Sequence, residues 1–557
     1  MENYQIADLL KDIARLMELH GENSFKIKYY QNAAFKLDRL TTPIYGLSKE
    51  ELENVDGIGK SLSAKLATYF TTGEIEDYQK LLSETPEGVL DIMHVKGIGP
   101  KKTSIIWKEM GIESLGELLY ACNENRLIEV KGFGAKTQQQ IKEAVQYKLA
   151  SKGYFHFATA EQLAETTFQK IKNLQGASWN YCGEFRRKCE ILQRIEIIIK
   201  NSFADEFKNL LLEKKELSLL NSEENKLEYN SSIGLPLNIT IVSDEHFIYE
   251  TWKHTGNEKH LAFCLENKSN IDITSCLSEE EIYNKLTLPY YIPELREGIL
   301  EEKYATSEST PTFIEYSDLK GCLHNHSTYS DGIHSLREMA LAARDLGLQY
   351  FGICDHSKSA GYANGLQIDR VIQQHQEIDL LNAELAPFKI FKGIESDILS
   401  DGNLDYPDNI LASFDFIVAS VHSGLKMDEE KATTRLIKAI ENPHTTILGH
   451  PTGRLLLARK GYPIDHKKVI DACAVNNVVI ELNAHPYRLD IDWRWIDYCM
   501  QKNVMISINP DAHETAGLLD MHYGVCAARK GGLTNAFTFN AFTLEEINNW
   551  FQKKKSS

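Results

Sequence analysis

The sequence lacks the features of a secreted or membrane-spanning protein. No stretch reaches the roughly 18 consecutive apolar residues that a transmembrane helix needs. The segment Met1–Leu10 includes Glu2 and Asp8 and contains no apolar signal-peptide core. The ten cysteines are scattered without a CxxC spacing, which indicates reduced thiols rather than a disulfide framework. We therefore expect a cytoplasmic chain that has no membrane partner.

Positive charge is also scarce. The chain carries 61 Lys and Arg against 79 Asp and Glu, which gives a net charge of −18. A protein this acidic is not expected to hold nucleic acid through a broad, nonspecific positive surface. The first 150 residues are closer to balance, with 19 Lys and Arg against 22 Asp and Glu. Any contact with nucleic acid in this part must therefore be local.

The C-terminal part contains a series of short apolar runs, each of which ends in a histidine or a carboxylate. One run leads into His324 and His326, whose i, i+2 spacing on a strand directs both imidazoles to one face. Strands that are apolar throughout are typical of parallel sheets, and residues at their C-terminal ends meet at the mouth of an α/β barrel. The candidate metal ligands found in this way are His324, His326, Asp331, His356, Glu395, His422, His450, Asp511 and His513. One such pair alone could be ordinary surface or core histidines, but so many similar placements favour a metal centre.

The motifs that carry these residues resemble the PHP (polymerase and histidinol phosphatase) family. The similarity runs from about Asp318 to the C-terminus and includes HNHSTYSDG, DHS, GIESDI, VHSG, GHPTGR and PDAH. It implies a distorted (β/α)7 barrel with three divalent metals. By this resemblance the first metal is held by His324, His326, Glu395 and Asp511, the second by Glu395, His422 and His450, and the third by Asp331, His356 and His513.

The predicted cluster suits the hydrolysis of a phosphate ester. Mixed histidine and carboxylate ligation suits Zn²⁺, Mn²⁺ or Fe²⁺. Such a cluster can generate hydroxide at neutral pH and clamp a phosphoryl group between cations, and we expect Glu395 and His422 to be central to it. Arg454 and Arg488 are candidate phosphate binders, because a guanidinium group matches phosphate bidentately. Ordinary surface salt bridges are the alternative for these two arginines.

Three copies of one glycine motif occur in the first 150 residues, as VDGIGK, VKGIGP and VKGFGA, and each is expected to precede a helix. The glycines permit a tight turn, and bare backbone N–H groups at a helix N-terminus can hold a phosphate. Such contacts position DNA without reading its sequence. One GxG is a common helix linker, but three copies with nearby lysines favour helix–hairpin–helix DNA binding. The candidate contacts are Gly57, Gly59, Lys60, Gly97, Gly99, Lys101, Gly132, Gly134 and Lys136.

Residues 1–150 resemble the lyase and fingers portions of family X DNA polymerases, in the bacterial PolX arrangement in which a PHP domain follows. Lys26, Tyr30 and Lys65 fall where that family places a 5′-phosphate pocket and a Schiff-base lysine. Lys65 could attack the aldehyde of an abasic sugar if its pKa were depressed. The alternative is a lysine that faces DNA or solvent.

Residues 154–245 should form the polymerase palm, and here the sequence departs from the family. The family pattern is Gly-Ser-x-Arg-Arg followed by Asp-x-Asp in an apolar strand. Glu184 replaces the serine, Arg194 the first aspartate, and Asn238 the third carboxylate, so only Glu196 remains. Mg²⁺ needs several oxygen ligands, and Arg194 could instead pair with Glu196. We therefore expect no Mg²⁺ at the palm and no polymerase activity, unless another register lets Glu190 serve.

The length of 557 residues favours several domains. We expect a multidomain α/β chain in which the helical N-terminal domains are followed by an α+β nucleotidyltransferase-like palm and thumb and then by the PHP barrel. The expected boundaries are 1–80 for the lyase-like domain with the first hairpin, 81–153 for the fingers-like domain, 154–245 for the palm, 246–300 for the thumb, 301–317 for a linker and 318–557 for the PHP domain.

Together these features predict a DNA repair protein of the PolX type. The PHP domain would be a metal-dependent 3′–5′ exonuclease, with AP endonuclease activity as a further candidate, acting at the nucleoid. The partner would be gapped, nicked or abasic DNA bound without sequence preference, and no feature specifies an oligomeric state. Three alternatives stay open: an active DNA polymerase X with 3′–5′ exonuclease, a small-molecule phosphatase of the histidinol-phosphatase type, and a non-catalytic DNA-binding scaffold.

Overall fold

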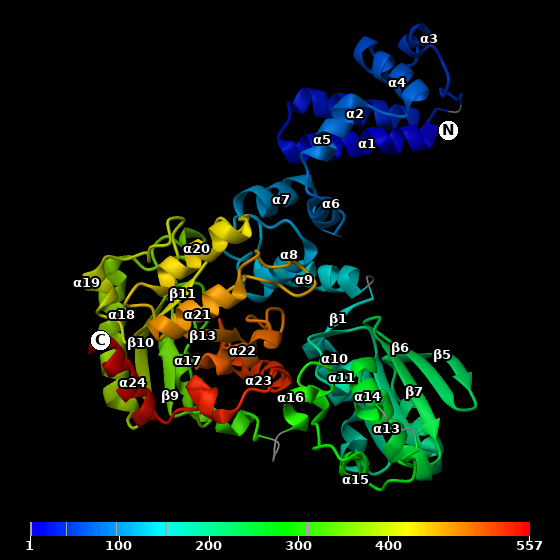
Figure 1. The fold of residues 1–557 in the computed structure, drawn as a ribbon. Coiled ribbons are helices and arrows are strands. Elements are labelled where there is room, and N and C mark those ends of the chain that lie inside the picture. The colour runs from blue at the N-terminus through cyan, green and yellow to red at the C-terminus, as the bar shows by residue number, and fades with distance from the viewer. Residues whose placement is uncertain are drawn as a thin grey trace. The chain divides into compact units, whose positions relative to one another are not determined.

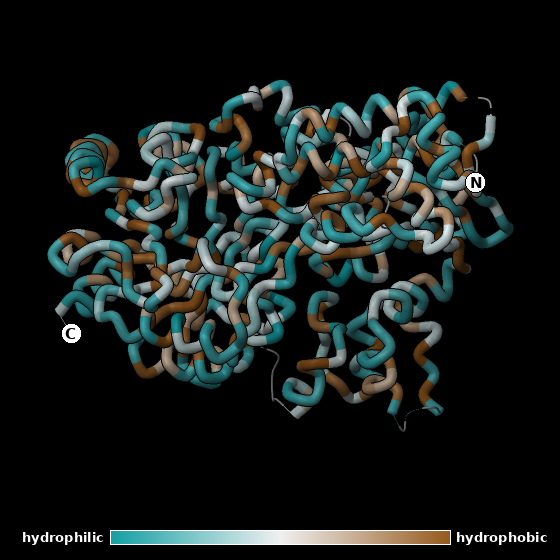
Figure 2. Tube along the Cα trace, turned by 90° about the horizontal axis from the view of Figure 1, so that it is seen from above, coloured by the Kyte–Doolittle hydropathy of each residue, from teal (hydrophilic) through white to brown (hydrophobic). Residues whose placement is uncertain are grey.

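The computed structural model describes residues 3–40, 42–95, 97–150, 153–266, 268, 270–306 and 311–556. The chain divides into two compact units (Figure 1). One consists of Met1–Asn123 and Leu127–Lys148, and the other of Glu124–Arg126 and Leu149–Ser557. Figure 2 shows short hydrophobic stretches alternating with hydrophilic ones along the chain, which is typical of half-buried helices and strands. No helix among the described residues is both long enough and apolar enough to cross a membrane.

The N-terminal unit is helical. Its elements are α1 (Asn3–His20), α2 (Ser24–Leu37), α3 (Lys49–Glu53), α4 (Lys60–Thr72), α5 (Glu76–Ser83), α6 (Glu87–Met93), α7 (Pro100–Ser104), the π-helical turn Ile105–Glu109, α8 (Leu115–Asn123) and α9 (Ala135–Ala150). Helix α1 buries Ile6, Leu10 and Met17, which recur at helical spacing. The Asn23 side chain caps α2 by accepting a hydrogen bond from the backbone N–H of Phe25 at 2.8 Å, as the sequence predicts.

The three glycine motifs form three turns of one kind. Gly57, Gly97 and Gly132 have φ of +93°, +89° and +98°, a left-handed conformation that side chains other than glycine rarely adopt. Gly59 and Gly99 then act as the N-caps of α4 and α7, and α9 begins at Ala135, the last residue of the third motif. Each motif therefore places backbone N–H groups at a helix start, which is the geometry expected of a phosphate contact.

The middle region, residues 153–306, contains a five-stranded mixed sheet in the order β2-β4-β7-β6-β5 and a two-stranded pair of β1 with β3. The strands are β1 (Phe155–His156), β2 (Trp179–Cys182), β3 (Ile191–Leu192), β4 (Ile195–Lys200), β5 (Leu217–Glu223), β6 (Lys226–Ser231) and β7 (Pro236–Val242). The helices are α10 (Phe157–Phe168), α11 (Gly183–Arg186), α12 (Ala204–Leu212), α13 (Phe247–Thr255), α14 (Glu258–Leu265), α15 (Glu279–Lys285) and α16 (Glu301–Ala305). This is the α+β architecture expected of a palm and thumb.

Helix α16 occupies the start of the segment for which the sequence predicts a linker. Glu301 is only 2% exposed, and its Oε1 lies 2.8 Å from Nδ1 of His260, which is itself fully buried. The middle region therefore continues to Ala305. Within the predicted linker, 301–317, residues 307–310 lie outside the described part of the chain.

The barrel region, residues 311–556, is built on seven parallel strands in the order β14-β13-β12-β11-β10-β9-β8. They are β8 (Gly321–Cys322), β9 (Tyr350–Ile353), β10 (Lys389–Asp397), β11 (Phe416–Ser420), β12 (Ile447–Leu448), β13 (Val479–Asn483) and β14 (Ile506–Asn509). A parallel bridge joins Asn325 to Ala512, and the N–H of His326 donates to the Ala512 carbonyl at 2.8 Å. These contacts bring the two edge strands together, so the sheet nearly closes and the predicted (β/α)7 fold is confirmed.

Helices surround these strands (Figure 1). They are α17 (Leu336–Asp345), α18 (Ile368–Leu385), α19 (Asp408–Leu411), α20 (Glu429–Ile440), α21 (His466–Asn476), α22 (Ile496–Gln501), α23 (Met521–Lys530) and α24 (Leu544–Ser556). A second hydrophobic cluster, separate from the one under the helices, includes Phe391 and Phe416 from the strands and Phe551 from α24. The Phe416 and Phe551 rings stack with centroids 5.3 Å apart. A Cβ on Gly393 would lie 2.4 Å from the Phe416 ring, so glycine is required beside it.

The middle region packs directly against the barrel region. Lys530 of α23 is buried, and its ammonium group donates to the Arg187 carbonyl at 3.0 Å and to Glu297 Oε1 at 2.5 Å. Arg529 pairs with Glu294 at 2.8 Å. A buried ammonium group is tolerated only when it is paired in this way, so these contacts fix the two regions against each other.

Candidate metal centre

All nine predicted ligands come together at the C-terminal ends of the barrel strands. His324 and His326 follow β8, His356 follows β9, Glu395 lies within β10, His422 follows β11, His450 follows β12, and Asp511 and His513 follow β14. Each of these side chains is buried or nearly so. The strand ends therefore position a ring of imidazoles and carboxylates, as the sequence predicts.

Glu395 lies at the middle of this ring. Its Oε1 is 3.0 Å from Nε2 of His422 and 2.9 Å from Nε2 of His450. Its Oε2 is 2.9 Å from Nδ1 of His356. A carboxylate with neighbours on both oxygens has the placement of a bridging ligand, which is the role that the resemblance gives to Glu395.

Two further groupings complete the ring. Asp331 lies 3.6 Å from His356 Nε2 and 3.4 Å from His513 Nε2. Asp511 Oδ1 lies 3.0 Å from His326 Nε2 and 3.4 Å from His324 Nε2. The ligand atoms fall within 4.8 Å of one another in three sets, which are His326, Asp331, His356 and His513; His324, His326 and Asp511; and His356, Glu395 and His422. These sets differ from the expected assignment: His326 also joins the third set and His356 joins Glu395, whereas the first set does not include Glu395 and the second does not include His450.

The donor atoms fit divalent cations. Among the described residues, His324 Nε2, Asp331 Oδ1, His356 Nδ1 and Glu395 Oε2 are buried atoms without a well-aligned hydrogen bond, although His356 Nδ1 and Glu395 Oε2 lie 2.9 Å apart. Leaving such atoms unsatisfied costs about 1–3 kcal/mol each. Nitrogen and oxygen donors in this mixture suit Zn²⁺, Mn²⁺ or Fe²⁺. The clustered His, Asp and Glu side chains thus support divalent metal binding.

The electrostatics of the ring favour positive charge. Burial alone would lower the pKa of His356, but Asp331 and Glu395 outweigh it and raise this pKa to about 10. Burial would raise the pKa of Glu395, but His422, His324 and His356 hold it well below its usual range. By contrast, burial and then the charges of His513 and His356 lower the pKa of His326 to about 3. A cation in this ring would meet ionised carboxylates and a neutral His326.

Buried carboxylates that the sequence analysis missed orient the histidines. Glu481 of β13 is fully buried and accepts hydrogen bonds from His324 Nδ1 at 2.7 Å, from the His450 N–H at 2.8 Å and from Asn509 at 3.0 Å. Asp397 lies 2.5 Å from His422 Nδ1. Carboxylates behind metal-binding histidines fix ring orientation and tautomer. A glutamate inside the apolar run VIELN was the available signal for Glu481.

The loop that carries Asp331 is tied to Asp355. The Asp355 carboxylate accepts from the N–H groups of Ser327 and Ser330 at 2.8 and 3.1 Å, and from Gln374 at 2.6 Å. These contacts hold the turn between His326 and Asp331. Asp355 therefore positions two of the candidate ligands and is not itself a member of the three clustered sets.

One more acidic side chain reaches the ring from an unexpected part of the sequence. The segment Glu124–Arg126 groups with the barrel unit. Glu124 is buried, pairs with His513 Nδ1 and lies 3.6 Å from His485 Nε2. The Arg126 guanidinium lies 4.8 Å from the ring centroid of Tyr362. No local motif marked Glu124, because its contact depends on the tertiary fold.

The two predicted phosphate binders differ. Arg454 donates to the Arg488 carbonyl at 3.0 Å and to Asp492 at 2.6 Å, and also bonds the Leu489 carbonyl. These partners already engage its guanidinium, which agrees with the salt-bridge alternative. The positive charge of Arg488 lowers the pKa of His450, after the larger effect of burial. Arg488 therefore lies close enough to the ring to remain a candidate phosphate contact.

Comparisons with known proteins agree with this geometry. Residues 1–75 match a helix-hairpin-helix domain, residues 89–146 a SAM-like helix-hairpin-helix tandem, and residues 323–485 the PHP domain. The chain is 33% identical to DNA polymerase/3′-5′ exonuclease PolX of Bacillus subtilis (strain 168), over 98% of this chain and 99% of that protein. The chain belongs to the PolX family. The PolX relationship and the matching hairpin domains support the predicted DNA binding, and the PHP domain is a hydrolytic enzyme domain.

The PHP part of this PolX-family chain is also similar to shorter proteins. A probable phosphatase of Thermoanaerobacter sp. (strain X514) is 27% identical over 42% of the chain and 94% of that protein. A probable phosphatase of Acetivibrio thermocellus is 31% identical over 29% of the chain and 65% of that protein. The barrel fold is therefore shared with proteins that are much shorter than PolX.

In the predicted palm of this PolX-family chain, the described residues place few carboxylates where a two-metal site would need them. Glu196 of β4 lies directly opposite Asn238 of β7 in the parallel register, so one carboxylate faces one neutral amide. Arg194 is exposed, and the described part of the chain does not show the ion pair with Glu196 that the sequence allowed as a possibility. Glu184 accepts the N–H of Gln193 at 3.2 Å. These residues do not fit two Mg²⁺ ions, which need several oxygen ligands each.

The arginine pair of the palm motif is used in internal contacts. Arg186 forms two bonds with Glu279, at 2.6 and 3.1 Å. Arg187 pairs with Glu297 at 3.1 Å and donates to the Thr255 carbonyl at 2.8 Å. Both guanidinium groups thus connect the sheet to the helices that follow it.

The predicted lyase residues lie together in the N-terminal unit. Lys65 pairs with Asp77 and donates to the Tyr30 hydroxyl at 3.1 Å, and Lys26 lies 3.7 Å from the same Asp77 carboxylate. Burial alone would lower the pKa of Lys65, but the hydrogen bonds with Asp77 and Tyr30 raise it. This direction is opposite to the one that a Schiff-base nucleophile needs.

Proposed function

We propose that this PolX-family chain is a metal-dependent 3′–5′ exonuclease and that the barrel region is its catalytic part. The observation that carries the proposal is the clustering of eight histidines and carboxylates beside the strand ends, with His450 next to Glu395 as a ninth and with buried donor atoms that lack hydrogen-bond partners. Three divalent cations, Zn²⁺, Mn²⁺ or Fe²⁺, would be held by the sets described above. When bound, they would supply an activated water and stabilise charge on the phosphodiester.

The side chains around the ring have defined tasks in this proposal. Glu395 and His422 hold the centre of the site, and Glu481 and Asp397 fix the imidazoles of His324 and His422. Arg488 supplies a fixed positive charge toward a phosphate that approaches His450. Arg454 acts through its contact with Asp492 and not through phosphate.

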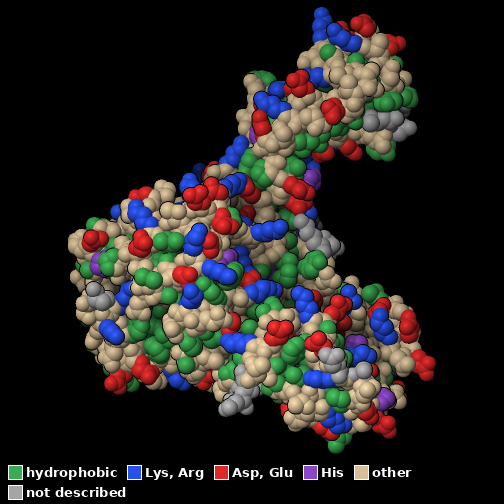
Figure 3. Space-filling view, viewed as in Figure 1, with side chains coloured by type: hydrophobic (Ala, Val, Ile, Leu, Met, Phe, Trp, Pro, Cys, Tyr) green, Lys and Arg blue, Asp and Glu red, His purple; other side chains and the backbone are tan. Residues whose placement is uncertain are grey.

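The hairpin turns would bring DNA to this site. Lys60, Lys101 and Lys136 are all exposed beside the glycine turns. On the face seen in Figure 3, Lys and Arg side chains are interspersed with Asp and Glu, which agrees with local contacts rather than a broad positive surface. The proposed substrates are gapped, nicked or abasic duplexes, bound without sequence preference at the nucleoid in the cytoplasm. Cutting at abasic sites would use the same metal centre.

Polymerase activity is proposed to be lost. Nucleotidyl transfer requires two cations that bridge the attacking oxygen and the triphosphate. The pair of Glu196 with Asn238, and the engagement of Arg186 by Glu279, support this loss. We also propose the domain division of the sequence analysis, except that the thumb continues through α16.

One gel assay tests the proposal. Parent protein and a His422→Ala variant are incubated with a 3′-recessed primer–template in Mn²⁺ or Mg²⁺, with and without dNTPs. The parent should shorten the primer, and His422→Ala should not, while both bind DNA with similar affinity. Shortening by His422→Ala at the parental rate would reject the assignment to the barrel.

Three further measurements distinguish the remaining alternatives, which are an active polymerase, a small-molecule phosphatase and a non-catalytic scaffold. Template-dependent extension by His422→Ala would restore the polymerase alternative. Phosphate release from histidinol phosphate without nucleotide release from DNA would favour a small-molecule phosphatase. A metal content near zero in freshly purified protein would favour a non-catalytic scaffold.

A further inference from the structure

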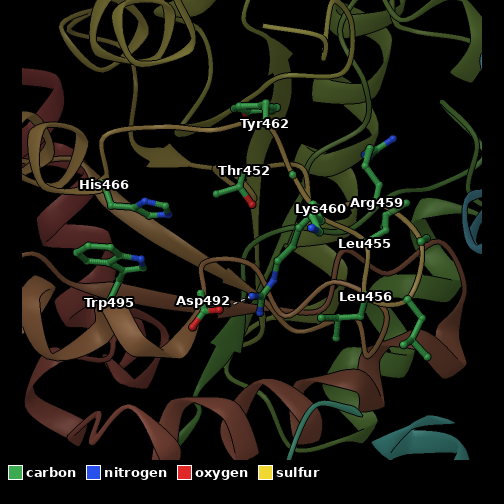
Figure 4. A pocket seen from close by; sticks show the side chains of 13 residues that line it. Thr452, Leu455, Leu456, Arg459, Lys460, Tyr462, His466, Asp492 and Trp495 are labelled. Carbon is green, nitrogen blue, oxygen red and sulfur yellow. Dashed lines mark hydrogen bonds and ion pairs between the residues drawn. The ribbon is translucent and has the colours of Figure 1, made fainter. Parts of the chain in front are cut away.

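A groove opens beside the metal centre, and the function proposed above leaves it without a role. It has a volume of about 540 Å³ and lies between residues 452–462, His466 and residues 492–495. This size falls within the roughly 300–1,000 Å³ of typical ligand pockets. Figure 4 shows the rings of His466 and Trp495 on one side of the groove and Arg459 and Lys460 on the opposite side.

The groove carries an excess of positive charge in an acidic protein. Arg454, Arg459 and Lys460 line it, and Asp492 is its acidic member. Asp492 is already paired with Arg454 at 2.6 Å and with Arg494 at 3.0 Å. Lys460 is exposed, and in the described part of the chain it has no hydrogen bond or ion pair. A surplus cation of this kind suits an anionic ligand such as a phosphate group.

The opposite side of the groove is lined by two aromatic rings stacked on each other. The rings of His466 and Trp495 are 4.6 Å apart between centroids and 6° from parallel. Both side chains are only half-buried. Burial lowers the pKa of His466, so its imidazole is neutral near pH 7. Aromatic faces opposite cations are the combination on which proteins hold a nucleotide, with the base stacked and the phosphate paired.

The groove adjoins the metal centre through the short segment from His450 to Thr452. Thr452, which lines it, is two residues beyond His450, and two residues of extended chain span at most about 7 Å. The N–H and hydroxyl of Thr452 both bond Asp490, at 3.0 and 2.9 Å, so this short connection is held in place. A strand whose terminal phosphodiester lies at the ring would bring a neighbouring nucleotide to the groove.

We propose that the groove binds the nucleotide adjacent to the one being removed. Its base stacks on Trp495, which His466 supports, and its phosphate faces Lys460 and Arg459. The inference rests on the proposed exonuclease function and adds a substrate subsite to it. Apolar side chains from Leu455 to Leu457 line the rest of the groove and favour a base over a hydrated ion.

The test uses the full chain carrying His422→Ala, so that the DNA is not degraded. Single-stranded oligonucleotides carry 2-aminopurine at the terminal, second or third position from the 3′ end, and fluorescence reports stacking. Trp495→Ala should weaken binding about 5- to 150-fold, as loss of one stacked base does. It should also remove the quenching at one position only.

Matched variants separate stacking and charge from a loss of fold. Trp495→Phe keeps a flat ring and should retain most of the binding. Lys460→Ala should reduce the slope of log affinity against log salt by about 0.7, the value for one phosphate contact on a single strand. Lys467→Ala, an exposed lysine on α21 that does not line the groove, should leave both the affinity and the slope unchanged.

Several results would contradict the proposed nucleotide subsite in the groove without contradicting the proposed exonuclease function. Parental affinity and quenching in Trp495→Ala would do so, as would equal losses in the Phe and Ala variants. If inorganic phosphate competed with the oligonucleotide as strongly as deoxyadenosine monophosphate does, the groove would bind an anion but would not recognise a base. If the parent protein did not shorten DNA, the proposed exonuclease function would be wrong. Position-specific quenching that is lost in Trp495→Ala would even then support nucleotide binding in the groove.

Discussion

Glu481 offers the sharpest test of how the barrel holds its metals. Its Oε1 accepts from His324 Nδ1 at 2.7 Å and from Asn509 at 3.0 Å, and its Oε2 accepts from the His450 N–H at 2.8 Å. Glu481→Gln keeps the shape but turns one oxygen into a donor, which must then face at least one N–H group. A buried donor left unsatisfied costs about 1–3 kcal/mol. Loss of a carboxylate behind a metal-binding histidine typically costs about 10- to 100-fold in metal affinity or activity.

The assay measures metal content and affinity directly. Parent and Glu481→Gln are dialysed against a series of buffered Zn²⁺ or Mn²⁺ concentrations, and bound metal is counted per chain by mass spectrometry. The variant should lose metal at about 10- to 100-fold higher free concentration, with DNA binding unchanged. Glu377→Gln is the control, because Glu377 of α18 accepts a hydrogen bond from the Tyr329 hydroxyl at 2.7 Å and, among the described residues, forms no hydrogen bond or ion pair with a candidate ligand. Parental metal affinity in Glu481→Gln would refute the idea that Glu481 orients His324.

Three other predictions follow from the structure. Because Asp77 raises the pKa of Lys65, borohydride should trap little covalent adduct with a pre-incised abasic duplex; strong trapping that Lys65→Ala abolishes would contradict this. Burial would raise the pKa of Glu279, but Arg296 and Arg186 lower it to about 2. The stability that the ionised Glu279 contributes is therefore complete above the pKa of an unfolded glutamate, about 4.3, and is lost as the pH falls toward 2. Acid unfolding should accordingly be less steep in Glu279→Gln. Chelation should abolish nuclease activity and lower the melting temperature, and added Mn²⁺ should restore both, since a ligand that binds only the folded state stabilises it; a melting temperature insensitive to chelator would count against a metal in the barrel.

The metal ring could be predicted because its information is local. The candidate ligands lie at or just beyond the ends of six apolar runs, and the parallel fold alone brings those ends together. His324 and His513, nearly 200 residues apart in sequence, needed no knowledge of side-chain contacts to be grouped. The glycine turns were equally predictable, because a positive φ at Gly57 depends on that residue and its immediate neighbours.

Contacts between distant segments were not predictable in the same way. Arg454 lies in the family motif GHPTGR, yet Asp492 and two carbonyls determine its direction. Lys65 occupies the expected helix position, but its protonation is set by Asp77 from the next helix. Glu301 looked like part of a charged linker until the fold placed it against His260. In each case a partner far along the chain decides the outcome.

The buried Lys530 makes the stability of the barrel region depend on the middle region. Its ammonium group needs Glu297 and the Arg187 carbonyl, both of which belong to the middle region. Breaking a buried pair of this type costs about 3–5 kcal/mol. Removing the middle region would therefore leave an uncompensated charge on α23 of the barrel region. The middle region thus has a structural task in this chain that does not depend on whether it transfers nucleotides.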